Sequence, residues 1–170
     1  MTDPRSLVEP LLTLAFPGDV ERTPGGYSEP GLHVRHLEVV YVDNSGADLQ
    51  EAYDEAAARV RASMLDIAES FSAAWGPSED LTFEVAWDDL VSQAISVRSS
   101  STQRIVTHTE DEWLTIDRAV WRVAQGGAST AVRWAVNDRR VTLFSEWQDR
   151  DLPITIEAVV STPLPTDDLP

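Results

Sequence analysis

The chain has 170 residues, of which 42% are hydrophobic, and this is enough to bury a core as a single domain. It has no cysteine, which excludes disulfides, thiolate metal ligands and cysteine nucleophiles. The basic residues number 13, all arginine, against 29 acidic residues, and the net charge of −16 disfavours binding to nucleic acid or to anionic membranes. A basic protein is the partner that this charge favours. The N-terminus lacks signal-peptide features and no apolar run could span a bilayer, so we expect a cytoplasmic protein.

The N-terminal part of the chain predicts one short helix, one loop and one strand. Apolar spacing over 6–16 is typical of a short helix, which Pro10 must either kink or begin. Prolines and glycines crowd residues 17–31, which predicts an irregular surface loop. Residues 32–42 are rich in Val and Leu and predict an interior strand, and a β-bulge would explain the break in its alternation near His36.

The longest periodic pattern in the sequence covers residues 48–75. Asp48 followed by Glu51 has the form of an N-terminal capping box, and Gly76 with Pro77 supplies a stop signal. A helix of this length would measure roughly 42 Å and would cross the whole domain, so we expect a sheet to lie against it. The apolar residues of its expected buried face recur every three or four positions: Leu49, Ala52, Tyr53, Ala56, Val60, Met64, Ile67, Phe71, Ala74 and Trp75.

The chain after the long helix contains a strand, an ambiguous segment and a second helix. Residues 81–87 alternate apolar and polar side chains and predict a strand. Residues 88–97 fit both a helix and a strand. Thr109 and the acids that follow it form a second capping pattern, and helical spacing continues beyond them. We therefore favour a helix over 110–125, although its β-branched residues also suit a strand.

The C-terminal third of the chain is strand-like. Residues 132–136 and 141–147 alternate on either side of a turn and predict a hairpin, and a further strand covers 154–160. Short connections between these strands favour an antiparallel meander. Residues 163–170 are expected to form a poorly ordered tail. The sequence therefore predicts one α+β domain over 1–162, in which a mainly antiparallel sheet packs against the long helix and the second helix.

No catalytic or metal-binding motif stands out. His33 and His36 lie three positions apart on a strand, so they point to opposite faces and cannot chelate one ion without a bulge. Adjacent carboxylates are common in a chain this acidic, and the serines at 99–101 lack the glycine elbow of a hydrolase. Most of the six tryptophans fall on expected buried faces. We therefore expect a non-enzymatic protein that needs no metal and no cofactor.

The segment 132–154 contains Val-Arg-Trp, Asn-Asp-Arg-Arg-Val and Ser-Glu-Trp-Gln-Asp-Arg-Asp-Leu-Pro-Ile. It resembles the end of small acidic proteins of unknown function from high-GC bacteria. A weaker likeness lies in the alanine-rich helix that ends at Trp75 and Gly76. The general style of an acidic α+β domain is also similar to that of bacterial toxin-immunity proteins. This resemblance implies a protein that neutralises a basic partner.

Our leading hypothesis is a non-enzymatic acidic interaction protein that binds a basic protein, in the manner of an immunity-type antagonist. The expected contact surface consists of two acidic stretches without arginine, one within 43–55 and one at 110–112. Its residues are Asp43, Asp48, Glu51, Asp54, Glu55, Glu110, Asp111 and Glu112.

The alternative hypothesis is a small-molecule-binding domain or a minor enzyme with a cleft between the sheet and the long helix. His108, Arg133 and Arg139 would then supply polar groups to the ligand. A homodimer formed through sheet edges or exposed tryptophans is compatible with either hypothesis.

Overall fold

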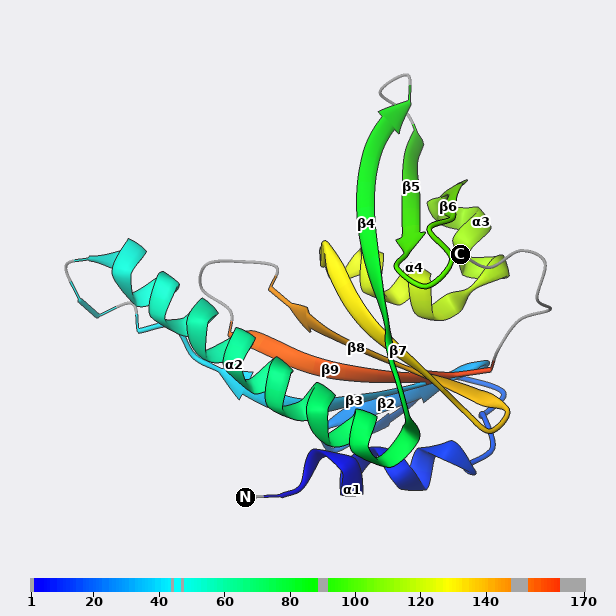
Figure 1. Cartoon of the computed structure of the whole chain (residues 1–170), viewed down its shortest axis with the longest axis horizontal. Helices are drawn as coiled ribbons and strands as arrows, with labels where there is room; N and C mark the ends of the chain where they lie inside the picture. The colour runs from blue at the N-terminus through cyan, green and yellow to red at the C-terminus, as the bar shows by residue number, and fades with distance from the viewer. Residues whose placement is uncertain (1, 44, 47, 89–91, 148–152, 163–170) are drawn as a thin grey trace.

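The protein is described by a computed structural model over residues 2–43, 45–46, 48–88, 92–147 and 153–162 (Figure 1). Within these ranges, nine strands form one antiparallel sheet in the order β1-β2-β3-β9-β8-β7-β4-β5-β6. This confirms the predicted α+β fold with a mainly antiparallel sheet and a long helix. The strands are β1 Glu21–Thr23, β2 Gly26–Glu29, β3 Leu32–Val40, β4 Glu79–Asp88, β5 Ser92–Ser99, β6 Ile105–Thr109, β7 Thr130–Val136, β8 Arg139–Glu146 and β9 Ile154–Ser161. The helices are α1 Pro4–Val8, the 3-10 helix η1 Glu9–Leu12, α2 Leu49–Trp75, α3 Glu110–Ile116 and α4 Arg118–Gln125.

Helices pack on both faces of this twisted sheet (Figure 1). α2 lies across one face, where it contacts β3, β7, β8 and β9, and α1 packs beside it. α4 contacts β8 and β9 from the opposite face, and α3 contacts β5 and β6. β4 rises steeply from the central strands, so β4, β5 and β6 extend the sheet beyond the part that α2 covers.

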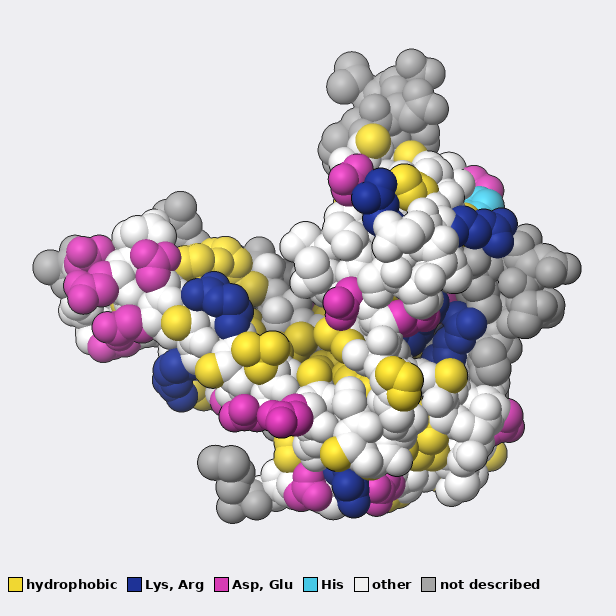
Figure 2. Space-filling model, in the orientation of Figure 1, with side chains coloured by type: hydrophobic (Ala, Val, Ile, Leu, Met, Phe, Trp, Pro, Cys, Tyr) yellow, Lys and Arg dark blue, Asp and Glu magenta, His cyan; other side chains and the backbone are white. Residues whose placement is uncertain are grey.

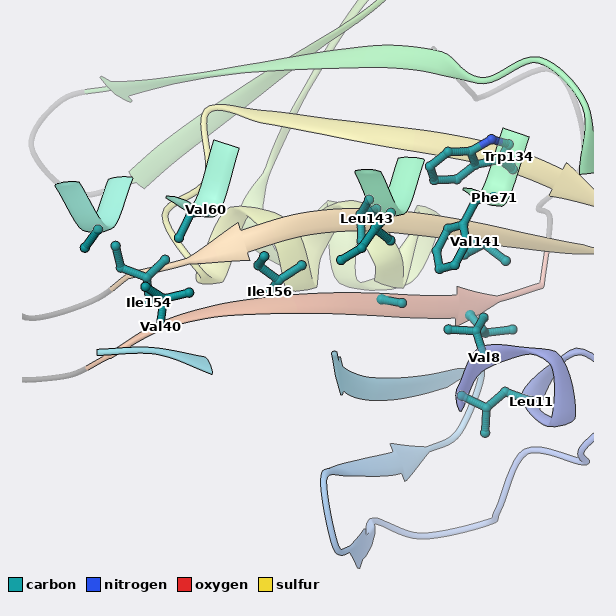
Figure 3. Packing of buried hydrophobic residues seen from close by; sticks show 14 residues of the cluster. Val8, Leu11, Val40, Val60, Phe71, Trp134, Val141, Leu143, Ile154 and Ile156 are labelled. Carbon is teal, nitrogen blue, oxygen red and sulfur yellow. The ribbon is translucent and has the colours of Figure 1, made fainter. Parts of the chain in front are cut away.

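The core beneath α2 consists of apolar residues that recur at every second position on the strands and every three or four positions on the helix (Figure 3). The even-numbered residues of β9, from Ile154 to Val160, point toward α2 because strand side chains alternate between faces. Phe71 of α2 meets Trp134 of β7 edge-on, with their ring centroids 5.3 Å apart. On α2 itself the fully buried residues recur at helical spacing: Ala56, Val60, Ile67 and Phe71.

A second core lies on the opposite face of the sheet, beneath α3 and α4. Trp113 is fully buried there, and its indole N–H donates a 2.9 Å hydrogen bond to the carbonyl of Ile95. Val120 of α4 packs into the same cluster as Val159 of β9. The odd-numbered residues of β9 therefore face α4, and Glu157 is one of them.

Several local predictions are confirmed. The side chain of Asp48 accepts a 3.0 Å hydrogen bond from the amide of Glu51 at the start of α2, and Gly76 ends the helix with a φ of 93°. The register between β3 and β9 shifts between His36 and Glu38, where the break in alternation indicated a bulge. β7, β8 and β9 are consecutive neighbours in the sheet, as expected for a meander.

The N-terminal segment is helical, and the described part of the ambiguous segment 88–97 forms strands. The N-terminal helical segment begins at Pro4 and continues as η1, which contains Pro10, so a 3-10 turn accommodates this proline. The ambiguous segment 88–97 belongs to strands where it is described, while 89–91 and the expected tail at 163–170 lie outside the described residues. None of the described helices combines the length and the apolar character needed to cross a lipid bilayer.

The prediction of an irregular loop over 17–31 is wrong, because β1 and β2 form a hairpin within it. Pro24 and Gly25 occupy the turn, and the φ of 80° at Gly25 suits a turn position that requires a left-handed residue. Gly26 then passes so close to β3 that a Cβ atom would lie 2.0 Å from the carbonyl oxygen of Val34. The glycines thus serve a tight strand pairing, which brings Tyr27 onto the sheet.

The predicted helix over 110–125 is present as two helices, α3 and α4, which are separated at Asp117. Asp117 has extended backbone angles, with φ −151° and ψ 100°. Its carboxylate accepts hydrogen bonds from the amides of Ala119 at 3.1 Å and Val120 at 3.3 Å, so it ends α3 and caps α4. The side chain competes with the backbone for these amides, which a helical pattern does not reveal.

Candidate functional site

Five of the predicted contact residues lie at the N-terminal end of α2, which projects beyond the sheet (Figures 1 and 2). Acidic side chains gather over this end in Figure 2. Asp43 accepts hydrogen bonds from the Ser45 amide at 3.0 Å and its hydroxyl at 2.5 Å, and these bonds hold the pKa of Asp43 below its usual range. All five carboxylates are exposed: Asp43, Asp48, Glu51, Asp54 and Glu55.

Two large apolar side chains adjoin the same acidic stretch. Tyr41 is 74% exposed just before it, and Leu49, the first residue of α2, is 52% exposed. In the part of the chain that the structure describes, no arginine forms an ion pair with any of the five carboxylates. Protein interfaces commonly combine exposed apolar side chains with neighbouring polar or charged ones. This end of α2 is therefore a candidate docking surface.

The second acidic stretch lies at the N-terminus of α3, on the other side of the molecule from the N-terminal end of α2 (Figure 1). Glu112 completes a capping box with Thr109, whose hydroxyl and amide hold the pKa of Glu112 below its usual range. Asp111 is exposed, whereas Glu110 is half-buried and faces a hollow. The structure therefore does not bring the two acidic stretches into one surface.

The three polar residues of the alternative hypothesis lie in three different surroundings. His108 contacts Glu112 at 3.2 Å and packs edge-on against the ring of Trp113. Arg139 donates a 2.6 Å hydrogen bond to the carbonyl of Leu11, on the side of the sheet that carries η1. These contacts secure helix ends and do not converge on one cleft.

Arg133, the third of them, belongs to a buried network. Its Nε donates a 2.6 Å hydrogen bond to Glu79, and its Nη1 lies 3.7 Å from Asp117. The hydroxyls of Ser99 and Ser101 donate to the other oxygen of Glu79, each at 2.6 Å. Burial would raise the pKa of Glu79, but these hydrogen bonds and the guanidinium outweigh it and the pKa is lowered. The network joins β4, β5 and β7 to the start of α4.

A second buried network centres on Arg122, between α4 and the sheet. Nη2 of Arg122 donates to Oε2 of Glu146 at 2.6 Å and to Oε2 of Glu157 at 2.8 Å. The other oxygen of Glu157 lies 3.1 Å from Nε2 of His36. The side chains of Arg122, Glu146 and Glu157 are only 10%, 15% and 2% exposed. Titratable side chains from α4, β3, β8 and β9 thus converge around the buried carboxyl group of Glu157.

Local sequence explains how Arg122 reaches this position. Asp117 starts α4, and the apolar residues Val120 and Val123 bury one side of this short helix against the sheet. Gly126 follows its last turn, where a Cβ atom would lie 3.1 Å from the ring of Phe144. The missing side chain lets the end of α4 approach β8 closely, so the guanidinium meets the carboxylates of the sheet.

Two hollows open beside this network and share Tyr27, Arg122 and Glu146. The Arg122 hollow has a volume of about 540 Å³ and lies between α4, β5, β4 and the start of α3. The His36 hollow has a volume of about 360 Å³ and lies over β2, β3 and β9. Polar residues line most of the Arg122 hollow: Tyr27, Gln93, Glu110, Arg122, Gln125 and Glu146. Its apolar wall consists of Val85, Ile95 and Ala124.

The network contains groups with displaced proton affinities. Burial raises the pKa of Glu157 to about 8, although Arg122 acts in the opposite direction. Burial lowers the pKa of His36, and Arg122 lowers it further. Burial also raises the pKa of Tyr27. Near neutral pH this arrangement favours a protonated Glu157 beside a neutral His36. The carboxyl group of Glu157 can then donate a hydrogen bond to Nε2 of His36 while both side chains are uncharged.

Sequence reasoning missed this site, although a signal was available. Glu157 is the one charged residue of β9, whose other residues are mostly apolar, and Arg122 lies between Val120 and Val123 on α4. A charge inside an apolar element is costly to bury and needs a partner, which makes such positions informative. The partners, however, come from strands that only the sheet register brings together.

The described residues contain no group of three His, Asp or Glu side chains that could hold a metal ion. No family model matches the chain, and neither a curated protein nor a solved structure matches it.

Proposed function

We propose that the protein is a non-enzymatic acidic interaction protein that binds a basic protein through the N-terminal end of α2. The observation that carries this proposal is the projecting end of the helix, where exposed carboxylates and the exposed side chains of Tyr41 and Leu49 are close neighbours in the sequence. Neutralisation of the partner, as by an immunity-type antagonist, is the specific form that the resemblance suggests.

Charge supports the choice of a basic partner. The first two turns of α2 carry Glu51, Asp54 and Glu55, and the first arginine of the helix, Arg59, comes only after them. With a net charge of −16, the whole molecule attracts a cationic protein, and an exposed cluster orients the encounter. The apolar side chains would supply the contact area that charge alone does not provide.

An affinity capture from the lysate of the producing cells tests this proposal. The double variant Asp54→Arg, Glu55→Arg changes the proposed surface and leaves the cap at Asp48 in place. The control Asp66→Arg, Glu69→Arg makes the same charge change on exposed positions farther along α2. We expect one basic protein to be retained by the wild type and the control at low salt, and to be lost by the test variant.

Equal retention by both variants would contradict the assignment of this surface. Recovery of no basic protein by folded wild type would contradict the proposed function itself.

A further inference from the structure

We infer that two copies of this chain pair antiparallel through β6, the strand at one edge of the sheet, and so form a two-fold symmetric dimer. This contact goes beyond the proposed function, because β6 leads directly into α3, on the other side of the molecule from the N-terminal end of α2 (Figure 1). It uses none of the α2 carboxylates.

The outer side of β6 can accept another strand. β6 is the last strand in the sheet order, and in the described part of the chain no strand lies beyond it. The amide of Ser99 donates to the carbonyl of Arg104 at 3.3 Å, and the register of β5 and β6 continues from this pair. Backbone groups of an antiparallel strand alternate in direction, so those of Val106 point to β5 and those of Ile105 and Thr107 point away from it. An added strand would bind these outward amides and carbonyls.

The helix that follows β6 turns back over the sheet. α3 packs on β5 and β6, and the indole N–H of Trp113 donates a 2.9 Å hydrogen bond to the carbonyl of Ile95 in β5. The turn begins at Thr109, whose amide donates to the carboxylate of Glu112 at 3.2 Å. α3 therefore lies over the face of the sheet and leaves the outer side of β6 to an added strand.

The residues of β6 suit strand pairing better than those of β1, the strand at the other edge. β6 has the sequence Ile-Val-Thr-His-Thr, which is rich in β-branched residues and contains neither proline nor an acidic residue. β1 has only three residues, and Glu21 and Arg22 are charged. Short length and charge are common protections of a sheet edge. Ile105 of β6 is also 52% exposed, and a second strand would cover it.

The charges on either side of β6 favour a second copy of the chain as the added strand. Arg104 precedes β6 and is exposed, whereas Glu110 and Asp111 follow it at the start of α3. When two copies pair antiparallel, the basic start of each strand lies beside the acidic end of the other. A parallel arrangement would instead place like charges side by side.

Full overlap of the two strands fixes the register. Thr107, at the centre of β6, then lies opposite Thr107 of the second copy, and Ile105 lies opposite Thr109. In this register the amides of Ile105 and Thr107 donate across the two-fold axis, because their groups point outward. A strand of five residues makes a small interface, so we expect a dissociation constant on the order of 10 μM.

Two variants of opposite charge at Thr107 test this register by sedimentation equilibrium at about 150 mM salt. Thr107→Asp and Thr107→Arg each place like charges opposite each other, so either variant alone should dimerise about fivefold more weakly than the wild type. An equimolar mixture should dimerise more tightly than either variant alone, because unlike charges then meet. Thr82→Asp, at an exposed position of β4 on the same face of the sheet, is the control and should keep the wild-type constant.

Amide hydrogen exchange locates the contact. The amides of Ile105 and Thr107 should exchange more slowly in concentrated than in dilute wild type, whereas that of Val106, which already bonds to β5, should change less. The inference is overturned if folded wild type stays monomeric at about 500 μM, or if a dimer forms without protecting Ile105 and Thr107. It is also overturned if Thr107→Asp dimerises as tightly as the wild type, or if the mixture dimerises no better than its components. Each of these results leaves the proposed partner binding at α2 to be judged by its own experiment.

Discussion

Nη2 of Arg122 donates a 2.8 Å hydrogen bond to Oε2 of Glu157, and the two side chains come from α4 and from β9. Both are almost completely buried, and Glu146 shares the same nitrogen of the guanidinium. The net stabilisation from a buried ion pair is small, because each charge must leave water. Removal of one partner nevertheless destabilises the fold, because it leaves the other groups buried without a partner. The network is therefore a sensitive point in the fold.

Replacement of Arg122 by Leu should test this dependence. We expect a loss of about 3 kcal/mol in the free energy of unfolding at neutral pH, because Glu146 and Glu157 lose their shared cation. The loss should be larger at pH 9, where the buried carboxyl of Glu157 has released its proton and depends on the guanidinium, than at neutral pH. Arg118→Ala is the control on the same helix, since its ion pair with Glu29 at 3.4 Å is partly exposed and should contribute at most about 1 kcal/mol. Urea unfolding at both pH values measures the difference, and equal losses for the two variants would contradict the account.

The raised pKa of Glu157 predicts how stability varies with pH. Between its ordinary value of 4.5 and about 8, the folded protein keeps a proton that the unfolded chain releases. The folded state binds more protons over this range, so this contribution to stability is complete at low pH and is lost as pH rises toward 8.

Glu157→Gln removes the titrating group and should therefore flatten the pH dependence. Between pH 5 and pH 8 we expect the wild type to lose about 3.5 kcal/mol relative to this variant. Asp66→Asn, at an exposed position on α2, should keep the wild-type slope. Urea unfolding at several pH values provides the comparison. Parallel curves for the wild type and Glu157→Gln would show that the buried carboxyl does not titrate in this range.

Two variants of Asp117 should separate the contribution of its helix cap to stability from the contribution of its charge. Asp117→Ala removes the hydrogen bonds to the amides of Ala119 and Val120 as well as the contacts of Arg133 and Arg140. We expect a loss of about 2 to 4 kcal/mol in the free energy of unfolding. Asp117→Asn keeps an oxygen acceptor for the cap and should recover about 1 kcal/mol. Thermal or urea unfolding of both variants checks this, and an Asn variant as unstable as the Ala variant would show that the cap contributes little.

The fit of α2 against the sheet can be tested at Phe71. This side chain is fully buried and contacts Trp134 edge-on (Figure 3). Phe71→Ala should cost about 3 to 5 kcal/mol, because the variant loses both transfer free energy and ring contacts. Leu65→Ala, at a position on the same helix that is 72% exposed, should change stability by less than about 0.5 kcal/mol. Similar unfolding midpoints for the two variants would mean that α2 is not anchored as described.

Sequence patterns predicted the helices and strands whose bounds are set by neighbouring residues in the chain. α2 combines a long helical period with a cap at Asp48 and a stop at Gly76, and its bounds follow from these signals. The alternation over 81–87 likewise identified β4, although the strand extends beyond it at both ends. The hairpin of β1 and β2 was missed because the glycine that permits its close pairing looks the same in sequence as a loop glycine.

The Arg122 network depends on relationships that a single sequence does not contain. Glu157 lies opposite His36 in the register that pairs β3 with β9, and this register shifts by one residue directly after that position. Arg122 faces them only because α4 starts afresh at Asp117 and does not continue α3. The acidic end of α2 could be predicted, because the sequence already shows a run of acidic residues that would lie on the surface. The separation between this end of α2 and the start of α3 could not be predicted, because it follows from the path of the whole chain (Figure 1).

The association rate constant with the captured basic partner, measured as a function of salt, tests the central claim most directly. We predict that the wild type and the Asp66→Arg, Glu69→Arg control associate fast at low salt and slow steeply as salt rises. The Asp54→Arg, Glu55→Arg variant should associate about tenfold more slowly at low salt, with a flatter salt dependence. An unchanged association rate and salt dependence in the Asp54→Arg, Glu55→Arg variant would contradict binding through the acidic end of α2.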